Sequence, residues 1–408
     1  MDNKPAALVL GGHVNSLSLV RSLAEGSMPI WLLHCRDGRA FRSRYVTRGF
    51  IRDYAGSDEA FVDALLEVGR LLDVRAVVYP THDYHVRVLA ENFDRLSEFY
   101  HIQINHRKAV EANSKRWQYA LCDRLGVPRP RTSHCETAEA FHALASGKVE
   151  LQFPWLLKPY ARNENPIKDV TIRAAQVNSV DEFERLMEKH PALRHGLLVS
   201  EVVPGGPDNI WAFTGYCDRP GSVLAGWTGR KLTQRPEMFG VFSTSESRLN
   251  DKVEQQGRVL LEVSEHMGIG EPEFKYDARD GKYKLTEINP RAHMWHMTGF
   301  YAGVNLPLIQ YYHLVGDEQR CRQLCRRQDE RPARLIFMGS ELQNIVDHRP
   351  TRKFIGNAVR ALLRSNKHFI VWRRDDPRPF YVGLRQDVKQ MAGLFVRRIK
   401  SAFHRSVG

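Results

Sequence analysis

Glu287, Asn289 and Arg291 are spaced two residues apart in the stretch KYKLTEINPRAHM, residues 282–294. The first part of the stretch alternates in the manner of a β-strand, in which side chains two residues apart point to the same face. Carboxylate and amide oxygens suit a hard cation, and a neighbouring arginine suits a phosphate. The solvent-facing side of an ordinary strand would give the same pattern. Residues elsewhere in the chain must therefore distinguish a cation and phosphate site from an exposed strand face.

A second strand precedes this one and predicts a hairpin. EPEFKYD and KYKLTEIN flank residues 278–281, which contain the Asp-Gly turn signal. The hairpin brings Glu273 near Glu287, and side chains directly opposite in such a pair lie about 5 Å apart. Two carboxylates at that distance repel one another unless a cation lies between them. With Asn289 they form an oxygen ligand set suited to Mg²⁺, and Arg291 lies within reach of the anion that the metal holds.

Two lysines far apart in sequence are further candidates. Lys115 lies in the segment 106–125, which has helical periodicity, and Lys158 ends the apolar run FPWLLK before a proline. Most lysines are exposed and need no partner. The ammonium group of Lys158 follows a buried segment, however, and there it requires either water or an anionic partner.

Composition indicates a globular protein with substantial cores. The chain has 408 residues, 42% of them hydrophobic, which is enough for two or three domains. It lacks an uninterrupted apolar run of the roughly 20 residues that a membrane span needs, and its N-terminus lacks a signal-peptide pattern. Six scattered cysteines fit a reducing compartment, so we expect a cytoplasmic protein. Cys321 and Cys325 have no second pair at zinc-site spacing and are predicted to be core or helix-surface thiols.

Positive charge is concentrated at the C-terminus. Residues 351–408 contain 14 lysines and arginines against three aspartates, whereas the preceding 350 residues are nearly neutral. Within this region an apolar stripe at helical spacing consists of Leu384, Val388, Met391, Phe395, Ile399 and Phe403. Such a basic helix suits the anionic inner face of a membrane, and packing on the protein body is the alternative. Nucleic acid is not expected, since no binding motif is present.

The first 105 residues alternate short apolar runs with helical patterns, which predicts a Rossmann-like parallel sheet. Four strands are expected, in AALVLGG, PIWLLHC, RAVVYPTHD and HIQIN. Ligands bind beyond the carboxyl ends of such strands. The residues there form the predicted substrate pocket: His13, Asn15, Thr81, His82 and Asp83. A dinucleotide fingerprint would need a third glycine and an acid after the second strand, so an NAD-dependent oxidoreductase is the less favoured alternative.

Several of these features together resemble the ATP-grasp superfamily of ligases. They are the stretches SEVVPGGPD and EFKYDARDGKYKLTEINPR and the two lysines. The resemblance implies an α/β chain with the ATP-grasp fold and four parts. These are an N-terminal parallel-sheet pre-ATP-grasp domain (1–106), a small nucleotide-clamping subdomain with its linker helix (107–200), a larger catalytic α+β subdomain (201–320) and a basic helical C-terminal extension (321–408).

The resemblance also implies roles for individual residues. ATP is bound by Lys115, Lys158, Glu201, Val203, Pro204 and Asp208. Mg²⁺, or Mn²⁺ in its place, is held by Glu273, Glu287 and Asn289. Catalysis falls to Arg291, beside the transferred phosphate, and to Arg230 or Lys231, beside the reacting carboxylate. One departure concerns the phosphate loop, which is often glycine-rich in this superfamily and here reads YARNENPIKDVTIRA, without glycine. The role of that loop is therefore left open.

Three further stretches narrow the resemblance to the D-aspartate ligase-like carboxylate–amine ligases. They are GRKLTQRPEMFGVFSTSES, YPTHDYHVRVLAENFDRLS and RRDDPRPF. It implies that ATP phosphorylates a substrate carboxylate, that an amine attacks the acyl phosphate, and that an amide, ADP and phosphate leave. The partners implied are a small carboxylate and a small amine; a homodimer is one candidate assembly. His293 and His296 either line the acceptor side or pack in the core. A non-catalytic, nucleotide-regulated binding protein on the same fold is a further alternative.

Overall fold

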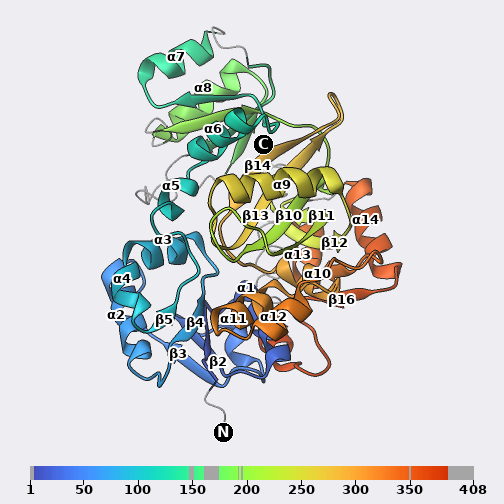
Figure 1. The fold of residues 1–408 in the computed structure, drawn as a ribbon. Helices are drawn as coiled ribbons and strands as arrows, with labels where there is room; N and C mark the ends of the chain where they lie inside the picture. Colours follow the sequence, from blue (N-terminus) through green and yellow to red (C-terminus); the bar gives the residue numbers. More distant parts are fainter. Residues whose placement is uncertain are drawn as a thin grey trace, which may run out of the picture. The chain divides into compact units, whose positions relative to one another are not determined.

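The structure is a computed structural model (Figure 1). It describes residues 4–146, 151–159, 174–191, 193, 196–348 and 351–384. The predicted phosphate loop at 160–174 and the predicted tail helix fall almost entirely outside these residues.

The chain divides into two compact units. The first consists of Met1–Leu121, Gly206–Phe274 and Glu287–Gly408, and the second of Cys122–Gly205 and Lys275–Thr286. The finer division into four parts stays a proposal from the sequence.

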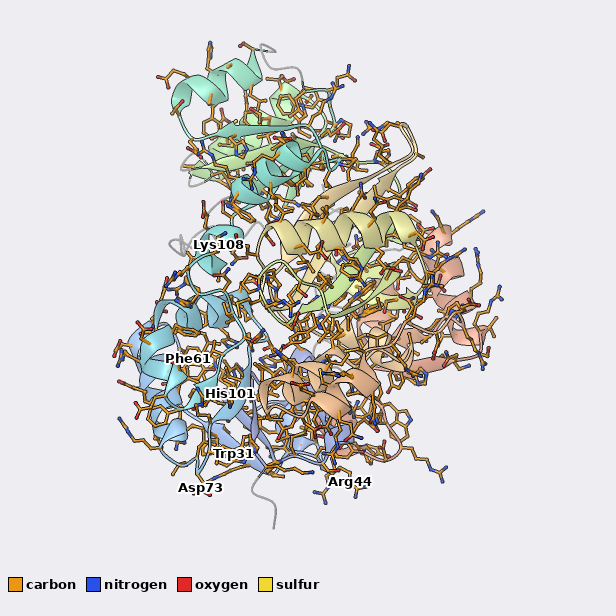
Figure 2. All side chains as sticks on the ribbon, in the orientation of Figure 1. Trp31, Arg44, Phe61, Asp73, His101 and Lys108 are labelled. Carbon is orange, nitrogen blue, oxygen red and sulfur yellow. The ribbon has the colours of Figure 1, made fainter. Side chains whose placement is uncertain are left out.

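The N-terminal part of the first unit contains a parallel sheet in the order β3-β2-β1-β4-β5, which confirms the predicted parallel topology. Its strands are β1 (Ala7–Leu10), β2 (Ile30–His34), β3 (Arg48–Ile51), β4 (Ala76–Tyr79) and β5 (Tyr100–His101), and its helices are α1 (Val14–Leu23), α2 (Asp58–Gly69), α3 (Asp83–Glu91), α4 (Phe93–Ser97) and α5 (Ala109–Ala112). Phe61 of α2, labelled in Figure 2, is fully buried in the core of this sheet.

Two strand predictions in this sheet differ from the structure. The edge strand β3 was not predicted, because Phe50 is its one buried residue and no apolar run marks it. The strand expected in HIQIN is only the pair Tyr100–His101, which begins one residue earlier and joins β4. Edge strands with few buried side chains leave little hydrophobic signal in a sequence.

A second, seven-stranded sheet has the order β14-β13-β10-β11-β12-β15-β16. The bounds are β10 (Ile210–Cys217), β11 (Ala225–Arg235), β12 (Val241–Ser247), β13 (Gly268–Asp277), β14 (Lys282–Asn289), β15 (Arg334–Ile336) and β16 (Lys367–Phe369). The helix α9 (Asp251–Val263) packs against β10. The hairpin of β13 and β14 was predicted and is confirmed.

Residues 223–247 contain two strands and a short turn, although their polar, basic middle suggests a longer loop between two apolar runs. Arg230 and Lys231 lie inside β11, which continues to Arg235, and the turn comes at 236–240. Arg230 is paired in register with Glu246 on β12, and this ion pair lets a charged residue occupy the middle of a strand.

One hydrophobic core joins the two sheets within the first unit. It contains Val9 and Leu17 from the N-terminal part together with Trp227, Trp295 and Ile309. The helix α1 contacts both α10 (His296–Tyr301) and α11 (Leu306–Leu314), as Figure 1 shows. The helices that follow β14 are therefore packed against helix α1 of the N-terminal part.

Arg21 of α1 anchors the C-terminal region. This region contains α12 (Glu318–Leu324), α13 (Met338–His348) and α14 (Arg352–Leu363). The fully buried Arg21 guanidinium donates to Asp376 Oδ2 at 3.0 Å and to the Ile370 carbonyl at 2.6 Å. Asp376 also accepts from the Ser43 hydroxyl at 2.8 Å and from the Arg44 main-chain N–H at 2.9 Å.

The second unit is built on an antiparallel sheet in the order β6-β9-β7-β8. Its elements are β6 (Thr132–Cys135), β7 (Trp155–Pro159), β8 (Ala175–Val177), β9 (Leu197–Glu201), α7 (Ala138–Ala145) and α8 (Val180–Lys189), and α6 (Lys115–Leu125) begins in the first unit. Trp155, Phe183 and Leu197 are central to its core. Among the helices described in either unit, none has the length and apolarity of a membrane span.

Replacing Asp376 with alanine is expected to cost about 3–5 kcal/mol of stability, because it leaves the buried Arg21 cation without its carboxylate. Urea denaturation of the full chain measures this loss. Asp375→Ala is the matched control, since the neighbouring Asp375 carboxylate is half exposed and its ion pair with Arg373 is worth at most about 1 kcal/mol. Equal losses in the two variants would contradict an anchoring role for Asp376.

Candidate active site

Lys231 and Glu273 form the most buried ion pair of the predicted site. Lys231 Nζ of β11 lies 2.6 Å from Glu273 Oε2 of β13, and both side chains are about nine-tenths buried. Burial disfavours the charged form of Lys231, but attraction from Glu273 and Glu287 outweighs it, so the pKa of Lys231 is raised. The Lys231 ammonium is therefore charged at neutral pH.

Lys115, the first residue of α6, forms the second ion pair. Its Nζ lies 3.0 Å from Glu287 Oε2 of β14. Burial again opposes the charge, yet Glu287 and Tyr119 raise the pKa of Lys115, and Glu273 contributes in the same direction. Because Glu273 acts on both lysines, the two ion pairs form one cluster of alternating charge.

Gln118 of α6 fixes the position of β14. Its side-chain amide accepts from the Ile288 N–H at 2.9 Å and donates to the Ile288 carbonyl at 3.1 Å, as a neighbouring strand would. Ile288 lies between Glu287 and Asn289, so this contact holds the part of β14 that carries these two predicted metal ligands. Gln118 was not singled out from the sequence, because a glutamine in a helix gives no signal of such a role.

Glu271 was also missed, although it lies two residues before Glu273 on the same strand and hence on the same face. Its buried carboxylate accepts from the Asn289 amide at 3.4 Å and from the Thr214 hydroxyl at 3.3 Å. Burial raises the pKa of the Glu271 carboxyl to about 7, against smaller opposing effects from His296 and Lys231. The period-two pattern of β13 is the signal that could have identified it.

Arg291 extends the site toward the N-terminal sheet. Its Nε donates to Asp83 Oδ1 at 2.6 Å, and the Asn15 side-chain oxygen accepts from the Met294 N–H at 3.3 Å. Asp83 and Asn15 are thus predicted pocket residues that contact the segment after β14. Asp83 begins α3, and Asn15 belongs to the first turn of α1.

The other three predicted pocket residues contact residues of the N-terminal part. The buried Thr81 hydroxyl donates to the Leu10 carbonyl at 2.6 Å. His82 caps α3, since its Nδ1 accepts from the Tyr84 N–H at 3.2 Å. The His13 ring lies edge-on to His34, with ring centroids 5.1 Å apart.

Arg230 and Lys231 have different surroundings because neighbouring residues of a strand point to opposite faces. The Arg230 guanidinium lies 2.8 Å from Glu246 Oε1 and stacks 5.5 Å from the Trp211 ring centroid. Only Lys231 of the two contacts a predicted metal ligand. The structure thus separates two residues that the sequence treats as alternatives for one role.

The predicted nucleotide residues divide between the units. In the first unit, Asp208 pairs with Lys353 of α14 at 2.9 Å. In the second, Lys158 lies on β7 opposite Leu198, and Val203 and Pro204 follow β9.

Glu201, at the end of β9, is held entirely within the second unit. It accepts from the Arg131 N–H at 3.1 Å, from Lys284 at 3.1 Å and from Arg279 at 3.0 Å. Burial would raise the pKa of the Glu201 carboxyl, but the Arg131 N–H and the Lys284 ammonium outweigh it and lower that pKa. Lys284 also contacts the buried Asp277 carboxylate at 2.7 Å.

Comparison with protein-family models gave no match. Among curated proteins, the chain is 23% identical to a D-aspartate ligase of Enterococcus faecium (strain Aus0004) over 301 residues, 70% of each chain. Among solved structures, it resembles an L-amino acid ligase from Bacillus licheniformis, with a TM-score of 0.55, 14% identity, and coverage of 77% of this chain and 75% of that one.

It also resembles the biotin carboxylase domain of Hydrogenobacter thermophilus 2-oxoglutarate carboxylase, solved with MgADP and bicarbonate, with a TM-score of 0.60 and 18% identity. That match covers 78% of this chain and 70% of the other. The similarity of these structures confirms the predicted fold class.

Lys284→Met should destabilise the protein at pH 7 by roughly 1.5–3 kcal/mol, the range for hydrogen bonds to charged groups. Arg279, then Lys284, hold the pKa of Asp277 below its usual range. A lowered carboxyl pKa stabilises the fold above the unfolded-state pKa near 4 and loses that effect as the pH falls. Urea denaturation should therefore show a gap between variant and wild type that narrows from pH 7 to pH 3.

The matched control is Lys282→Met, which removes an exposed lysine from the same strand. We expect this variant to behave like the wild type at both pH values. A gap for Lys284→Met that stayed constant with pH would argue against a carboxylate partner.

Proposed function

We propose that this chain, which has the ATP-grasp fold, is an ATP- and Mg²⁺-dependent carboxylate–amine ligase that makes an amide or peptide bond through an acyl phosphate. The observation that carries the proposal is the linked pair of ion pairs, Lys231–Glu273 and Lys115–Glu287, beside Asn289 and Arg291. The similarity to D-aspartate ligase over 70% of both chains supports the same reaction class.

The reaction does not require a protein side chain to form a covalent bond with the substrate. A substrate carboxylate attacks the γ-phosphorus of ATP, and the bond to the leaving ADP breaks. The amine then attacks the acyl carbon, phosphate leaves, and the amine loses a proton. Both steps build negative charge on phosphate oxygens, so positioned cations accelerate them. Lys115, Lys231 and Arg291 supply those cations in the first unit.

The ion pairs prepare these cations for substrate. Each basic group is paired with a carboxylate, which keeps it charged and oriented while no phosphate is bound. Phosphate oxygens can then replace or share these contacts as charge-assisted hydrogen bonds. We assign nucleotide binding to Lys115, Lys158, Glu201, Val203, Pro204 and Asp208 on the basis of the sequence resemblance.

Glu273, Glu287 and Asn289 would hold the Mg²⁺. Two carboxylates and one amide oxygen on neighbouring strands suit a cation that takes oxygen ligands and keeps part of its shell for water and phosphate. When bound, the ion supplies positive charge to the β- and γ-phosphates. The lysines that face the two glutamates neutralise them until then, which is why a site so rich in carboxylates can be buried.

The proposal is tested by measuring ADP release from Mg·ATP with the full chain and a panel of carboxylate and amine pairs, with the amide product identified by mass spectrometry. We expect release that requires both substrates. Lys231→Met should lower kcat by at least about 10²-fold, the loss typical of removing one transition-state contact. Glu287→Ala should abolish turnover.

Arg230→Met is the matched control for Lys231→Met, because its guanidinium faces Glu246 on the opposite side of the same strand. It should retain most of the activity. Equal losses in the two variants would overturn the catalytic assignment of Lys231, and failure of every pair to release ADP would favour a nucleotide-binding protein without ligase activity.

The basic C-terminus supports a second proposal, contact with an anionic membrane surface through residues 384–403. The described residues just before this segment include the exposed side chains of Trp372, Tyr381 and Val382, which are 39%, 58% and 41% exposed. The exposed arginines Arg374 and Arg378 lie among them. Interfacial aromatic residues together with basic ones are typical of membrane-surface binding.

Sedimentation with vesicles tests this proposal. Full-length protein should sediment with phosphatidylserine vesicles at low salt and be released by high salt, whereas phosphatidylcholine vesicles should not bind it. A form ending at Tyr381, which keeps Asp376 and its anchor, should stay in the supernatant with both. Full-length protein that remains in the supernatant at low salt would refute membrane contact.

A further inference from the structure

Glu271, His293 and His296 form a compact cluster that the ligase mechanism does not use. One potential metal-ligating atom of each lies within 4.8 Å of the others. Glu271 and His296 are each 2% exposed, and His293 Nε2 lies 3.0 Å from Glu271 Oε1. The cluster combines β13, the loop after β14 and the first residue of α10.

The orientation of His296 leaves one nitrogen unused. Its Nδ1 lies 2.7 Å from the His293 main-chain nitrogen and 2.9 Å from the His293 carbonyl oxygen. Its Nε2 is buried and makes no hydrogen bond to any residue that the structure describes. A buried polar atom without a partner is costly, and a ligand at this nitrogen would remove that cost.

A second layer of contacts holds the cluster in place. The Thr214 hydroxyl donates to Glu271 Oε2 at 3.3 Å and accepts from the Trp295 indole N–H at 3.1 Å. The Trp295 main-chain N–H is directed at His293 Nδ1 at 3.4 Å. An outer hydrogen bond that orients a carboxylate, as Thr214 does for Glu271, is a regular feature of protein metal sites.

We infer that Glu271, His293 and His296 bind a divalent transition-metal ion such as Zn²⁺, at a site separate from the Mg²⁺ ligands Glu273 and Glu287. Two imidazole nitrogens and one carboxylate oxygen are a ligand set for Zn²⁺ and its neighbours, whereas Mg²⁺ prefers oxygen ligands throughout. Three protein ligands also leave a coordination position for water or a substrate group.

The charged groups nearest the cluster are already engaged in ion pairs. Lys231 and Arg291 do not repel a bound metal ion as unpaired cations, because they form ion pairs with Glu273 and Asp83.

The experiment titrates chelator-treated full-length protein with Zn²⁺ and Co²⁺ in the absence of nucleotide and Mg²⁺. Wild type should bind one equivalent tightly, give the visible d–d absorption of cobalt bound to imidazole, and gain thermal stability with Zn²⁺. His296→Ala and Glu271→Gln should each lower Zn²⁺ affinity at least about tenfold, since replacing even outer-shell residues has effects of that size.

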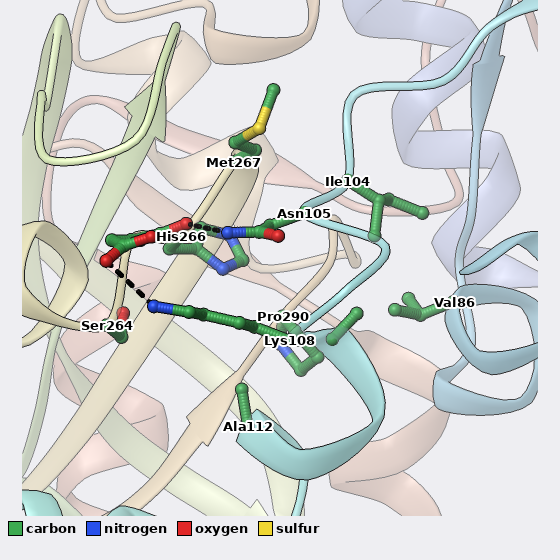
Figure 3. Close-up of a pocket in the computed structure, with 11 residues that line it drawn as sticks. Val86, Ile104, Asn105, Lys108, Ala112, Ser264, His266, Met267 and Pro290 are labelled. Carbon is green, nitrogen blue, oxygen red and sulfur yellow. Dashed lines mark hydrogen bonds and ion pairs between the residues drawn. The ribbon is translucent and has the colours of Figure 1, made fainter. Parts of the chain in front are cut away.

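His266→Ala is the matched control. Figure 3 shows His266 in a different pocket, near Asn105 and Lys108, and its Nε2 also makes no hydrogen bond among the described residues. It has no part in the cluster, so its loss should leave Zn²⁺ binding unchanged. A general effect of removing a buried histidine would instead appear in both histidine variants.

Glu287→Gln distinguishes the two metal sites and should keep Zn²⁺ binding. Zn²⁺ binding that is lost in Glu287→Gln but retained in His296→Ala would place the metal at the Mg²⁺ ligands and overturn the inference. Absence of stoichiometric binding to wild type would overturn it as well. If circular dichroism shows that His296→Ala is unfolded, the isosteric Glu271→Gln variant and the wild-type cobalt spectrum decide the question.

Discussion

The charge balance of three carboxylates on two neighbouring strands is the constraint on which the rest of the site depends. Glu271, Glu273 and Glu287 are partly or fully withdrawn from water, and side by side they would repel one another. Each of the latter two is paired with a lysine, whereas Glu271 is surrounded by hydrogen-bonding side chains and has a raised pKa. Lysines paired in this way are charged and oriented before any phosphate arrives.

The fold of the first unit brings Lys115, Lys231 and Arg291 to the two strands that carry these carboxylates. Lys231 is carried by the same sheet, but Lys115 comes from α6, which Gln118 ties to the main chain of β14. Arg291 is held by Asp83 of the N-terminal part, and the shared core around Trp227 and Trp295 keeps that part in place. The buried Arg21–Asp376 pair then attaches the C-terminal region to the same body. A carboxylate-rich site of this kind therefore requires contributions from most of the unit.

Local patterns explain which features the sequence could predict. The β13–β14 hairpin, the parallel N-terminal sheet and the candidates Glu273, Glu287, Asn289 and Arg291 follow from alternation, turn signals and family resemblance. The edge strand β3 could not be predicted, because it buries only Phe50. The basic segment around Lys231 does not look like a strand in the sequence, because the balancing Glu246 and Glu273 lie on other strands and are not evident along the chain.

The sequence by itself indicated the parallel N-terminal sheet through its periodicity, and the fold class and candidate site residues through the resemblance to a known superfamily, since both depend only on patterns along the chain. The tertiary structure alone decided that Lys231 rather than Arg230 contacts Glu273, and that the pocket candidates Asn15 and Asp83 contact the segment after β14. It also brought Glu271 together with His293 and His296. These partnerships join residues from separate elements, and their distances are set by how helices and strands pack, which a linear pattern does not encode.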